Sequence, residues 1–416
     1  MRLILCDVDA EARAGLAPLA LSRPIWQLRS GMTTLGRRLA AHLGSADVAG
    51  FVPAHLAPAA AHDGDWPVND PGTLSGDDLL IVDARLKPAG LDITFDGSSE
   101  IAHDSEGRFV YARIARDDLA RLETDSLEAL LASAGAALPA VCKDPPRWRH
   151  AWELMSDNAE QITADFHAVG RSGVASSGEP PILVGDERDV YVAPDATIGP
   201  RVVVDVSNGP VYVDSAAEIQ PFTHIAGPCY VGAGSVLLGA KCRGGTTVGP
   251  QCRVGGEVEQ VIFQGHANKY HDGFLGHAVV GAWVNLGAGT TNSDLRNDYA
   301  PVRVCLDGHT LVETGCLKVG ALIGDHCRSS IGTLLNTGTC VGPMTMLVGG
   351  GGLLPRFVPA FSVCAGSEIA ETFSRRRFYD IAARALPRRG QQWTEADERM
   401  WDAIYEQTAE QRAYST

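Results

Sequence analysis

Aliphatic residues return at every sixth position through much of the second half of this 416-residue chain. An α-helix would need a period of about 3.6 residues, and a half-buried strand would alternate strictly. A period of six fits neither, and it predicts a coil with three flat strand faces that point aliphatic residues inward. The repeating positions are Val192, Ile198, Val204, Val213, Ile219, Ile225, Val231, Leu237, Val248, Val254, Phe274, Val280, Leu286, Leu311, Leu317, Ile323, Leu335, Val341 and Leu347, with Ser329 as the polar exception.

Glycine often follows the aliphatic residue, as in Ile198-Gly199, Val231-Gly232 and Ile323-Gly324. Small residues relieve the corners of such a coil, and stacked coils pair as parallel strands about 4.8 Å apart. We therefore predict a left-handed parallel β-helix of hexapeptide repeats over residues 186–352. Left-handed winding runs against the usual rule for parallel crossovers, so the sequence must specify it strongly.

Three segments interrupt the period. Residues 205–212 insert a short excursion, residues 259–273 replace a coil with a polar, histidine-rich stretch, and residues 291–310 form a second polar loop. Loops that leave a rigid solenoid usually carry its function. We therefore expect the chemistry of this half in the two polar segments.

Residues 1–168 have a different pattern, in which short apolar strands alternate with helices. Residues 2–6 and 78–83 are typical of buried strands, and residues 25–43 and 119–134 of helices. This order predicts an α/β domain with a parallel sheet. A ligand of such a domain would lie at the carboxyl ends of the strands.

Two further segments complete the predicted organisation. A linker rich in Gly, Ser and Pro is predicted at residues 169–185. Residues 353–416 form a tail that is helical over 366–412 and contains Trp393 and Trp401. We expect this tail to cap or brace the solenoid.

Composition excludes several classes of function. The chain has 45% hydrophobic and 20% charged residues, an ordinary balance for a globular protein. Its net charge of −15 argues against a nucleic-acid partner, because phosphate backbones require basic patches. Runs of about 18 apolar residues are absent, as is a signal-peptide pattern, so no membrane contact is expected. The ten cysteines lack metal-ligand spacing, which predicts reduced thiols and a cytoplasmic protein.

Two motifs in the solenoid resemble a known family. His271–His277 (HDGFLGH) and Val284–Thr290 (VNLGAGT) are similar to segments of the bifunctional uridyltransferase/acetyltransferases that make UDP-N-acetylglucosamine (GlmU-like proteins). Pro18–Pro24, Leu28–Gly31 and Ala151–Leu154, followed by Asn158, resemble divergent sugar nucleotidyltransferases that share this two-part layout. The likeness to this divergent subgroup covers nearly the whole chain. The resemblance implies a nucleotidyltransferase-like N-terminal domain and an acetyltransferase solenoid.

The resemblance also implies roles for residues of the solenoid. Acyl transfer to a sugar amine needs a general base, which the family places at the position of His271. Asn285 would contact the acceptor sugar, and Ala288 with Gly287 and Gly289 would let acetyl-CoA, or another acyl-CoA, lie close to the backbone. The other expected acceptor contacts are Asn268, Lys269, Phe274, His277, Arg296 and Arg303. Plainer interpretations stay open: His271 as a surface or interface histidine, His277 as structural, and Asn285 as part of an asparagine ladder.

Departures from the family pattern change the expected acceptor. Phe274 stands where the family has a tyrosine, and Glu259 and Ala300 stand where it has lysines. Lys269, Arg296 and Arg303 could supply replacement charge, since guanidinium groups suit phosphate. The glucosamine-1-phosphate pocket is therefore not reproduced, and we predict a different sugar phosphate or a nucleotide sugar as the acceptor.

The N-terminal domain lacks the family's glycine-rich phosphate loop. Residues 7–13, which follow the first strand, are acidic and free of glycine, and this argues against the usual phosphate cradle. Arg23 and Arg29 are candidates to bind nucleotide phosphates instead. Asp83, at the end of its strand, resembles the family's metal-holding aspartate, and Asn158 is a second candidate Mg²⁺ ligand. The plainer alternatives are a salt bridge between domains for the arginines and a solvated strand-end acid for Asp83.

Three hypotheses about function follow. The first is an acyl-CoA-dependent acyltransferase on a sugar phosphate or nucleotide sugar, carried by the β-helix. The second is a Mg²⁺-dependent sugar-1-phosphate nucleotidyltransferase in the N-terminal domain, alone or alongside the first activity. The third is a scaffold or regulatory protein whose sites have decayed. The resemblance further implies a homotrimer and a place in cell-envelope biosynthesis.

Overall fold

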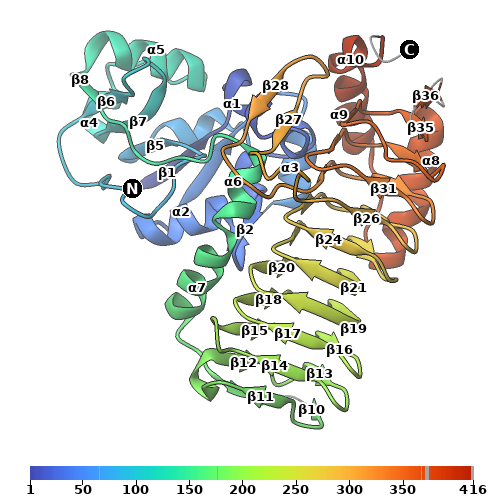
Figure 1. The fold of residues 1–416 in the computed structure, drawn as a ribbon. Helices are drawn as coiled ribbons and strands as arrows, with labels where there is room; N and C mark the ends of the chain where they lie inside the picture. Colours follow the sequence, from blue (N-terminus) through green and yellow to red (C-terminus); the bar gives the residue numbers. More distant parts are fainter. Residues whose placement is uncertain (65, 176, 367, 371–373, 414–416) are drawn as a thin grey trace.

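The structure is a computed structural model that describes residues 1–416 except 65, 176, 367, 371–373 and 414–416. An α/β domain lies beside an upright stack of β-coils (Figure 1). Helix α7 (Asn158–Val169) runs from this domain down to the first coil, and the later coils climb back along the domain. Residues far apart in sequence are thereby brought into contact.

The N-terminal domain is built on a six-stranded sheet of order β4-β1-β5-β7-β6-β8. Strand β1 pairs in parallel with β4 and β5, whereas β7 is antiparallel to both β5 and β6. The sheet is therefore mixed rather than wholly parallel as predicted, with parallel pairing in β4-β1-β5 and in β6-β8. The strands are β1 (Arg2–Cys6), β4 (Val48–Phe51), β5 (Leu79–Asp83), β6 (Glu100–His103), β7 (Phe109–Ile114) and β8 (Ala140–Cys142).

Apolar layers cover both faces of this sheet. Leu3 and Leu5 of β1 pack with helix α2 (Leu35–Leu43), while Ile4 packs in a separate cluster with helix α5 (Leu127–Ala137). Alternate residues of β1 therefore face different helices. This explains why the strand is a continuous apolar run rather than an alternating one.

The second half is a parallel β-helix, as the six-residue period predicts. One face is a ten-stranded column in which β12 (Val190–Val192), β15 (Val211–Val213), β18 (Cys229–Val231) and β20 (Thr246–Val248) follow one another in register. Most of the predicted aliphatic positions lie in one buried core inside the coils. Three do not: Leu275 replaces Phe274 in the core, and Leu311 and Leu317 are 46% and 56% exposed in the segment that leaves the coils.

The solenoid is longer at both ends than the sequence indicates. The predicted linker, 169–185, already contains β9 (Gly173–Val174), β10 (Ser177–Gly178) and β11 (Ile182–Val184), which pair in parallel with the next coil. Beyond residue 352, β34 (Phe357–Val358) and β35 (Val363–Ala365) continue the stack. Strands of two or three residues in a segment rich in glycine and serine cannot be told from a linker by sequence alone.

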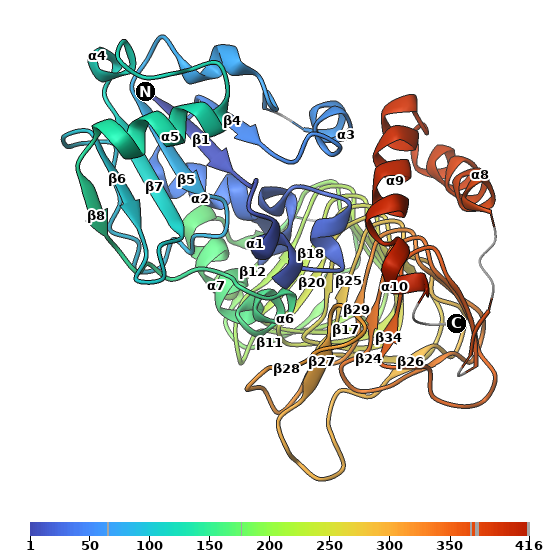
Figure 2. The same ribbon diagram turned by 90° about the horizontal axis from the view of Figure 1, so that it is seen from above.

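Only one of the two polar segments leaves the stack. Residues 259–273 form a regular coil, since β22 (Ile262–Phe263) pairs with β20 and β23 (Asn268–Lys269) pairs with β21 (Arg253–Glu259). After β26 (Thr291–Asn292) the chain does leave, through an antiparallel hairpin of β27 (Arg303–Cys305) and β28 (Leu311–Glu313). This hairpin projects from the side of the prism (Figure 2).

Large side chains occupy a left-handed corner position in five successive coils: His266, Trp283, His326, Met344 and Phe361, with φ between 54° and 61°. We call them the corner ladder. Neighbouring corners are linked by backbone bonds, such as His326 N–H to the Ala282 carbonyl at 2.9 Å. Non-glycine residues seldom adopt this conformation.

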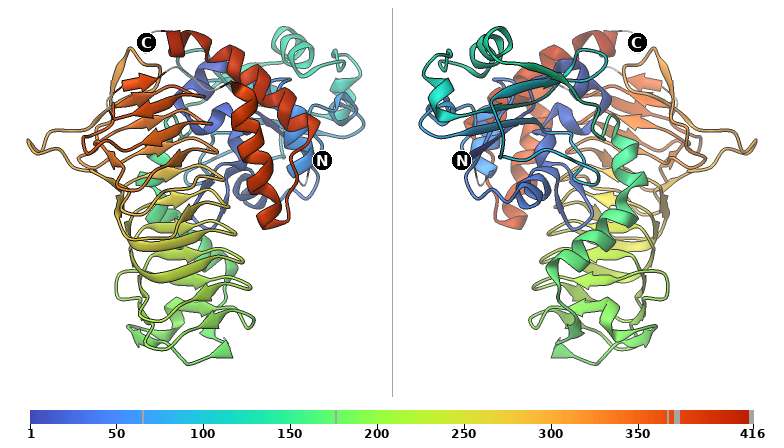
Figure 3. Two further views of the ribbon diagram at one scale, coloured as in Figure 1. Left: turned by 90° about the vertical axis from the view of Figure 1, so that its right-hand side faces the viewer. Right: turned by 90° about the vertical axis from the view of Figure 1, so that its left-hand side faces the viewer.

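The C-terminal helices cover the corner ladder. Phe361 makes edge contacts with Phe378 and Tyr379 of α8 (Arg375–Ala385) and with Trp401 and Tyr405 of α9 (Glu395–Gln407). These helices lie against the flank of the stack (Figure 3). The tail thus lies against the solenoid, and α9 also meets the N-terminal domain through α3 (Ala57–Asp63).

The N-terminal motifs form the interface with the solenoid. Asn158 is fully buried: its Oδ1 accepts from Gly31 N at 2.6 Å and its Nδ2 donates to the Gly245 carbonyl at 2.7 Å. Gln264 exchanges hydrogen bonds with the backbone N–H and carbonyl of Arg29. The described helices include none long and apolar enough to cross a membrane, and the ten cysteines are unpaired.

Candidate functional site

His271 lies at a corner of the β-helix, in the turn between β23 and β24 (Phe274–Gly276). It is exposed, its ring contacts only Tyr270 edge-on at 5.4 Å, and no hydrogen bond to the imidazole is found among the described residues. The imidazole is therefore accessible to a ligand. This placement agrees with the sequence-based prediction of a reactive histidine but does not test it.

Lys269 holds the backbone of this corner. Its side chain is buried, and Nζ donates to the carbonyls of Gly255 at 3.0 Å and His271 at 2.6 Å. Burial lowers the pKa of the ammonium group to about 8. The prediction of Lys269 as an acceptor contact is therefore not supported by its position, because its donors already face carbonyl groups inside the turn.

Asn268 and Asn285 form a short asparagine ladder on the strand before this corner. Nδ2 of Asn268 donates to Oδ1 of Asn285 at 2.6 Å, and Asn285 stacks in turn on Arg328 of the next coil. Both amides are half-buried and border an open cavity. The structural interpretation of Asn285 as a ladder residue thus holds, and it leaves each amide group with further hydrogen-bonding capacity.

His277 pairs with an acid on the neighbouring coil. Its Nδ1 lies 2.7 Å from Oδ2 of Asp294, and both side chains are largely buried. Burial would raise the pKa of Asp294, but the hydrogen bond from His277 and the charge of Lys318 hold it below its usual range. Phe274 lies nearby with its ring against Gly276. His277 is therefore a buried, paired histidine, in contrast to the exposed His271.

The two arginines of the extruded segment have local partners. Arg296 Nε lies 2.8 Å from Asp298 Oδ1, and Arg303 lies 3.8 Å from Glu313 across the β27–β28 hairpin. Neither pair is deeply buried, so both could be exchanged for a ligand at small cost. The predicted acceptor contacts thus fall into two groups, one around the His271 corner and one on the projecting hairpin.

A ridge rich in glycine runs up the stack beside His271. Its residues are 287–289, 330–332 and 349–350, and we call it the glycine ridge. Gly289 N–H bonds the Asp272 carbonyl at 2.8 Å, and Gly332 N–H bonds the Ala288 carbonyl at 2.7 Å. A Cβ on Gly332 would meet nothing within 4 Å, so the outer side is open, and Ile331 is 76% exposed there. The structure therefore brings His271 and Gly287–Gly289 to adjacent turns of one corner.

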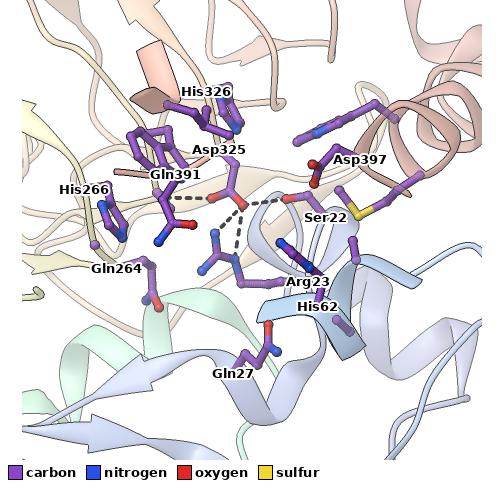
Figure 4. Close-up of a pocket in the computed structure, with 18 of the residues that line it drawn as sticks. Ser22, Arg23, Gln27, His62, Gln264, His266, Asp325, His326, Gln391 and Asp397 are labelled. Atoms are coloured by element: carbon purple, nitrogen blue, oxygen red, sulfur yellow. Dashed lines mark hydrogen bonds and ion pairs between the residues drawn. The ribbon is translucent and has the colours of Figure 1, made fainter. Parts of the chain in front are cut away.

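A larger cavity, about 440 Å³, lies where all three parts of the chain meet (Figure 4). Stacked rings of the corner ladder form one wall: His266 and Trp283 are 4.3 Å apart, and Trp283 and His326 6.2 Å. Burial lowers the pKa of His266 to about 4 and that of His326 to about 3, so both are neutral at pH 7. The polar lining includes Gln27, Gln264, Gln391, Gln392 and Asp397.

Sequence reasoning missed this cavity, because its lining comes from residues more than 300 positions apart. It placed Arg23 near a nucleotide phosphate, whereas Arg23 pairs with Asp325 of the solenoid, which also accepts from Ser22 Oγ at 2.8 Å and Ala282 N at 2.7 Å. Arg23 therefore forms a salt bridge between the domains, which is the plainer alternative for this residue. Its phosphate role would require breaking this buried contact.

Arg29 lies in a different environment. Its Nη1 donates to the Met32 carbonyl at 2.6 Å, its Nε has no hydrogen-bond partner, and no ion pair of Arg29 is found among the described residues. Burial lowers its pKa. It borders a cavity of about 470 Å³ together with Trp66 and Tyr230. Arg29 therefore remains a candidate for binding an anion.

Asp83 lies at the carboxyl end of β5, as predicted, but two arginines already donate hydrogen bonds to its carboxylate. Its Oδ1 accepts from Arg85 Nε at 3.0 Å, and its Oδ2 from Arg85 Nη2 at 2.7 Å and Arg147 Nη1 at 3.4 Å. The described residues include no cluster of three His, Cys, Asp or Glu side chains arranged to hold a metal. The residues present therefore do not fit Mg²⁺ at this strand end, where the cavity measures only about 90 Å³.

Comparison with known proteins agrees with this architecture. A family model described as sugar nucleotidyl transferase matches residues 3–172. The bifunctional protein GlmU of Jannaschia is 29% identical over 238 residues, covering 53% of this chain and 51% of that protein. GlmU of Sphingopyxis alaskensis is 32% identical over 196 residues, covering 45% and 42%. The chain thus spans about half the length, or less, of the curated relatives it matches.

Among solved structures, the UDP-N-acetylglucosamine acyltransferase of Arabidopsis is similar, with 14% identity and a TM-score of 0.27 over 55% of this chain and 94% of that one. A TM-score this low carries no inference about activity. Residues 3–172 thus match the sugar nucleotidyl transferase family model, and the chain is similar to GlmU in its arrangement of an α/β domain followed by a parallel β-helix.

Proposed function

We propose that the protein is an acyl-CoA-dependent acyltransferase that acts on a sugar phosphate or a nucleotide sugar. The observation that carries the proposal is the corner where the exposed His271 lies one coil from the open glycine ridge. His271 would accept the proton that the acceptor amine or hydroxyl loses as it attacks the acyl carbon. A base is required there, because an ammonium at neutral pH cannot attack.

The glycine ridge fits a coenzyme that lies along the backbone. Gly332 bonds the Ala288 carbonyl and faces open space, and Ile331 beside it is an exposed apolar contact. Bound acyl-CoA would supply the acyl group as an activated thioester, whose C–S bond breaks so that coenzyme A leaves as the thiol with the proton taken up by His271. Lys269 fixes the carbonyl of His271, and Asn285 presents an amide beside the corner for acceptor hydroxyl groups. The same proposal includes assembly as a homotrimer, in which a neighbouring prism would complete the coenzyme site.

The test is acetyl transfer from acetyl-CoA to a panel of sugar phosphates and nucleotide sugars. His271→Ala should lower kcat/KM about 10²- to 10⁴-fold, the usual contribution of a general base. His42→Ala is the matched control, because His42 is an exposed histidine on α2 of the other domain. Acetyl transfer that survives in His271→Ala, or no thermal shift with any acyl-CoA at about 100 times a typical Kd, would contradict the proposal.

A second candidate is nucleotidyl transfer by the N-terminal domain, which the family match over residues 3–172 favours. The geometry is less favourable, since the cavity at the strand ends is about 90 Å³ and typical ligand pockets are about 300–1,000 Å³. Stabilisation by UTP or dTTP without any effect of acyl-CoA would favour this activity. Binding of neither ligand class would favour the scaffold hypothesis.

A further inference from the structure

Four arginines gather where the connection between α8 and α9 meets the solenoid. Arg253 and Arg328 lie on the same strand column, separated by the rungs of Asn268 and Asn285. Arg388 and Arg389 come from the short helix that follows α8. Arg328, Arg388 and Arg389 line one cavity of about 80 Å³ with both asparagines, which is room for more than one water molecule of about 30 Å³.

These arginines lack counter-charges. No ion pair of Arg253, Arg328, Arg388 or Arg389 is found in the part of the chain that the structure describes. Burial lowers the pKa of Arg328 and Arg389, and the charge of Arg388 lowers both further. Nε of Arg389 is buried without a hydrogen-bond partner. These positively charged groups repel one another and lie together without an acidic partner, although the protein has a net charge of −15.

Unpaired, half-buried cations are costly, and such strain clusters at binding sites. Guanidinium forks suit phosphate oxygens, and the asparagine amides can add neutral hydrogen bonds. The cavity also shares His266 and Trp283 with the 440 Å³ cavity between the domains. A ligand could therefore place phosphates among the arginines and a flat ring on the neighbouring stack.

We propose that this arginine cluster binds the diphosphate of a nucleoside diphosphate group, with the nucleoside directed along the His266–Trp283 wall. Nucleotide sugars and coenzyme A both contain such a group, so either could be the source. The cavity shares Asn268 and Asn285 with the expected acceptor contacts, but its arginines and His271 are separate residues. It requires no acyl transfer, so it can be tested whether or not the acyltransferase proposal holds.

Calorimetric titration of the full chain tests the site. UDP-glucose and coenzyme A are titrated separately, to decide which of the two kinds of ligand supplies the diphosphate. UDP and ADP serve as the minimal ligands, and uridine and adenosine as controls without phosphate. Arg328→Gln and Arg388→Gln should each raise Kd about tenfold or more, as expected for a lost charge-assisted hydrogen bond. Arg188→Gln should leave Kd unchanged, because Arg188 is an exposed arginine at the start of the solenoid.

Thermal unfolding of the ligand-free variants separates binding from bracing. Arg328→Gln should leave the melting temperature unchanged or raise it, since it removes a desolvated charge beside Arg388. A sharp fall would mean that Arg328 is a structural brace and would overturn the proposal. So would equal Kd values in all variants, binding of uridine or adenosine as tight as that of the diphosphates, or no binding to wild type at millimolar concentration.

Discussion

At the scale of single residues, the solenoid contains a buried charged side chain, Lys269, that holds one of its turns. Lys269 occupies a buried position beside Val254, where the period alone predicts an apolar side chain. Two backbone carbonyls compensate its ammonium only in part, because burial still lowers its pKa to about 8. Lys269 therefore fixes the His271 turn but lowers the free energy of unfolding, because its charge is buried.

This cost predicts how stability depends on pH. The folded pKa of Lys269 lies below the unfolded value of about 10.4, so the unfolded chain holds one more proton between the two values and stability rises with pH there. Between pH 7.5 and 10 this contribution is roughly 2–3 kcal/mol. Denaturant unfolding of wild type and Lys269→Met should show the wild type gaining relative to the variant as pH rises. A constant difference would contradict the buried charge.

At the scale of elements, the corner ladder joins coils to helices. Phe361 is fully buried under α8 and α9, whereas Phe222 has a similar left-handed φ (63° against 58°) and is 73% exposed. The two phenylalanines therefore differ in what covers them rather than in backbone conformation. The ladder therefore stabilises the fold only where the C-terminal helices bury its side chains.

Phe361→Ala should lower the free energy of unfolding by about 3–5 kcal/mol, because it empties an enclosed aromatic contact. Phe222→Ala should change it by no more than about 0.5 kcal/mol. Equilibrium unfolding in urea gives both values, and limited proteolysis should cut the tail of the Phe361 variant first. Equal effects of the two substitutions would mean that the tail does not brace the stack.

The sequence predicts the coils well and their corners poorly. The inward aliphatic positions follow from the six-residue period, because every coil must fill the same core. The ladder does not follow, since Trp283 and Phe361 stand at left-handed corners where propensity favours glycine. The His271 turn was found from its motif. The arginine cluster was not, because Arg328 and Arg389 meet only once the tail has docked.

At the scale of the whole molecule, the two halves are coupled through a few buried polar contacts. Asp325 receives Arg23, Ser22 and the Ala282 N–H, and the side chains of Asp325 and Arg23 are 5% and 16% exposed. Asn158 forms a second tie to the solenoid. These contacts come from the segment that matches the sugar nucleotidyl transferase model, so that segment also forms the docking surface for the β-helix.

This coupling predicts the behaviour of Arg23→Met, which leaves the carboxylate of Asp325 buried without its cation. The loss should be about 3–5 kcal/mol, the usual result of removing one partner of a buried pair. Calorimetry should then resolve a separate, earlier transition of the N-terminal domain. Arg188→Met, which removes an exposed pair with Asp186, should cost no more than about 1 kcal/mol. If both variants melt like wild type, apolar packing alone holds the halves together, and the 440 Å³ cavity between them does not depend on the Arg23–Asp325 pair.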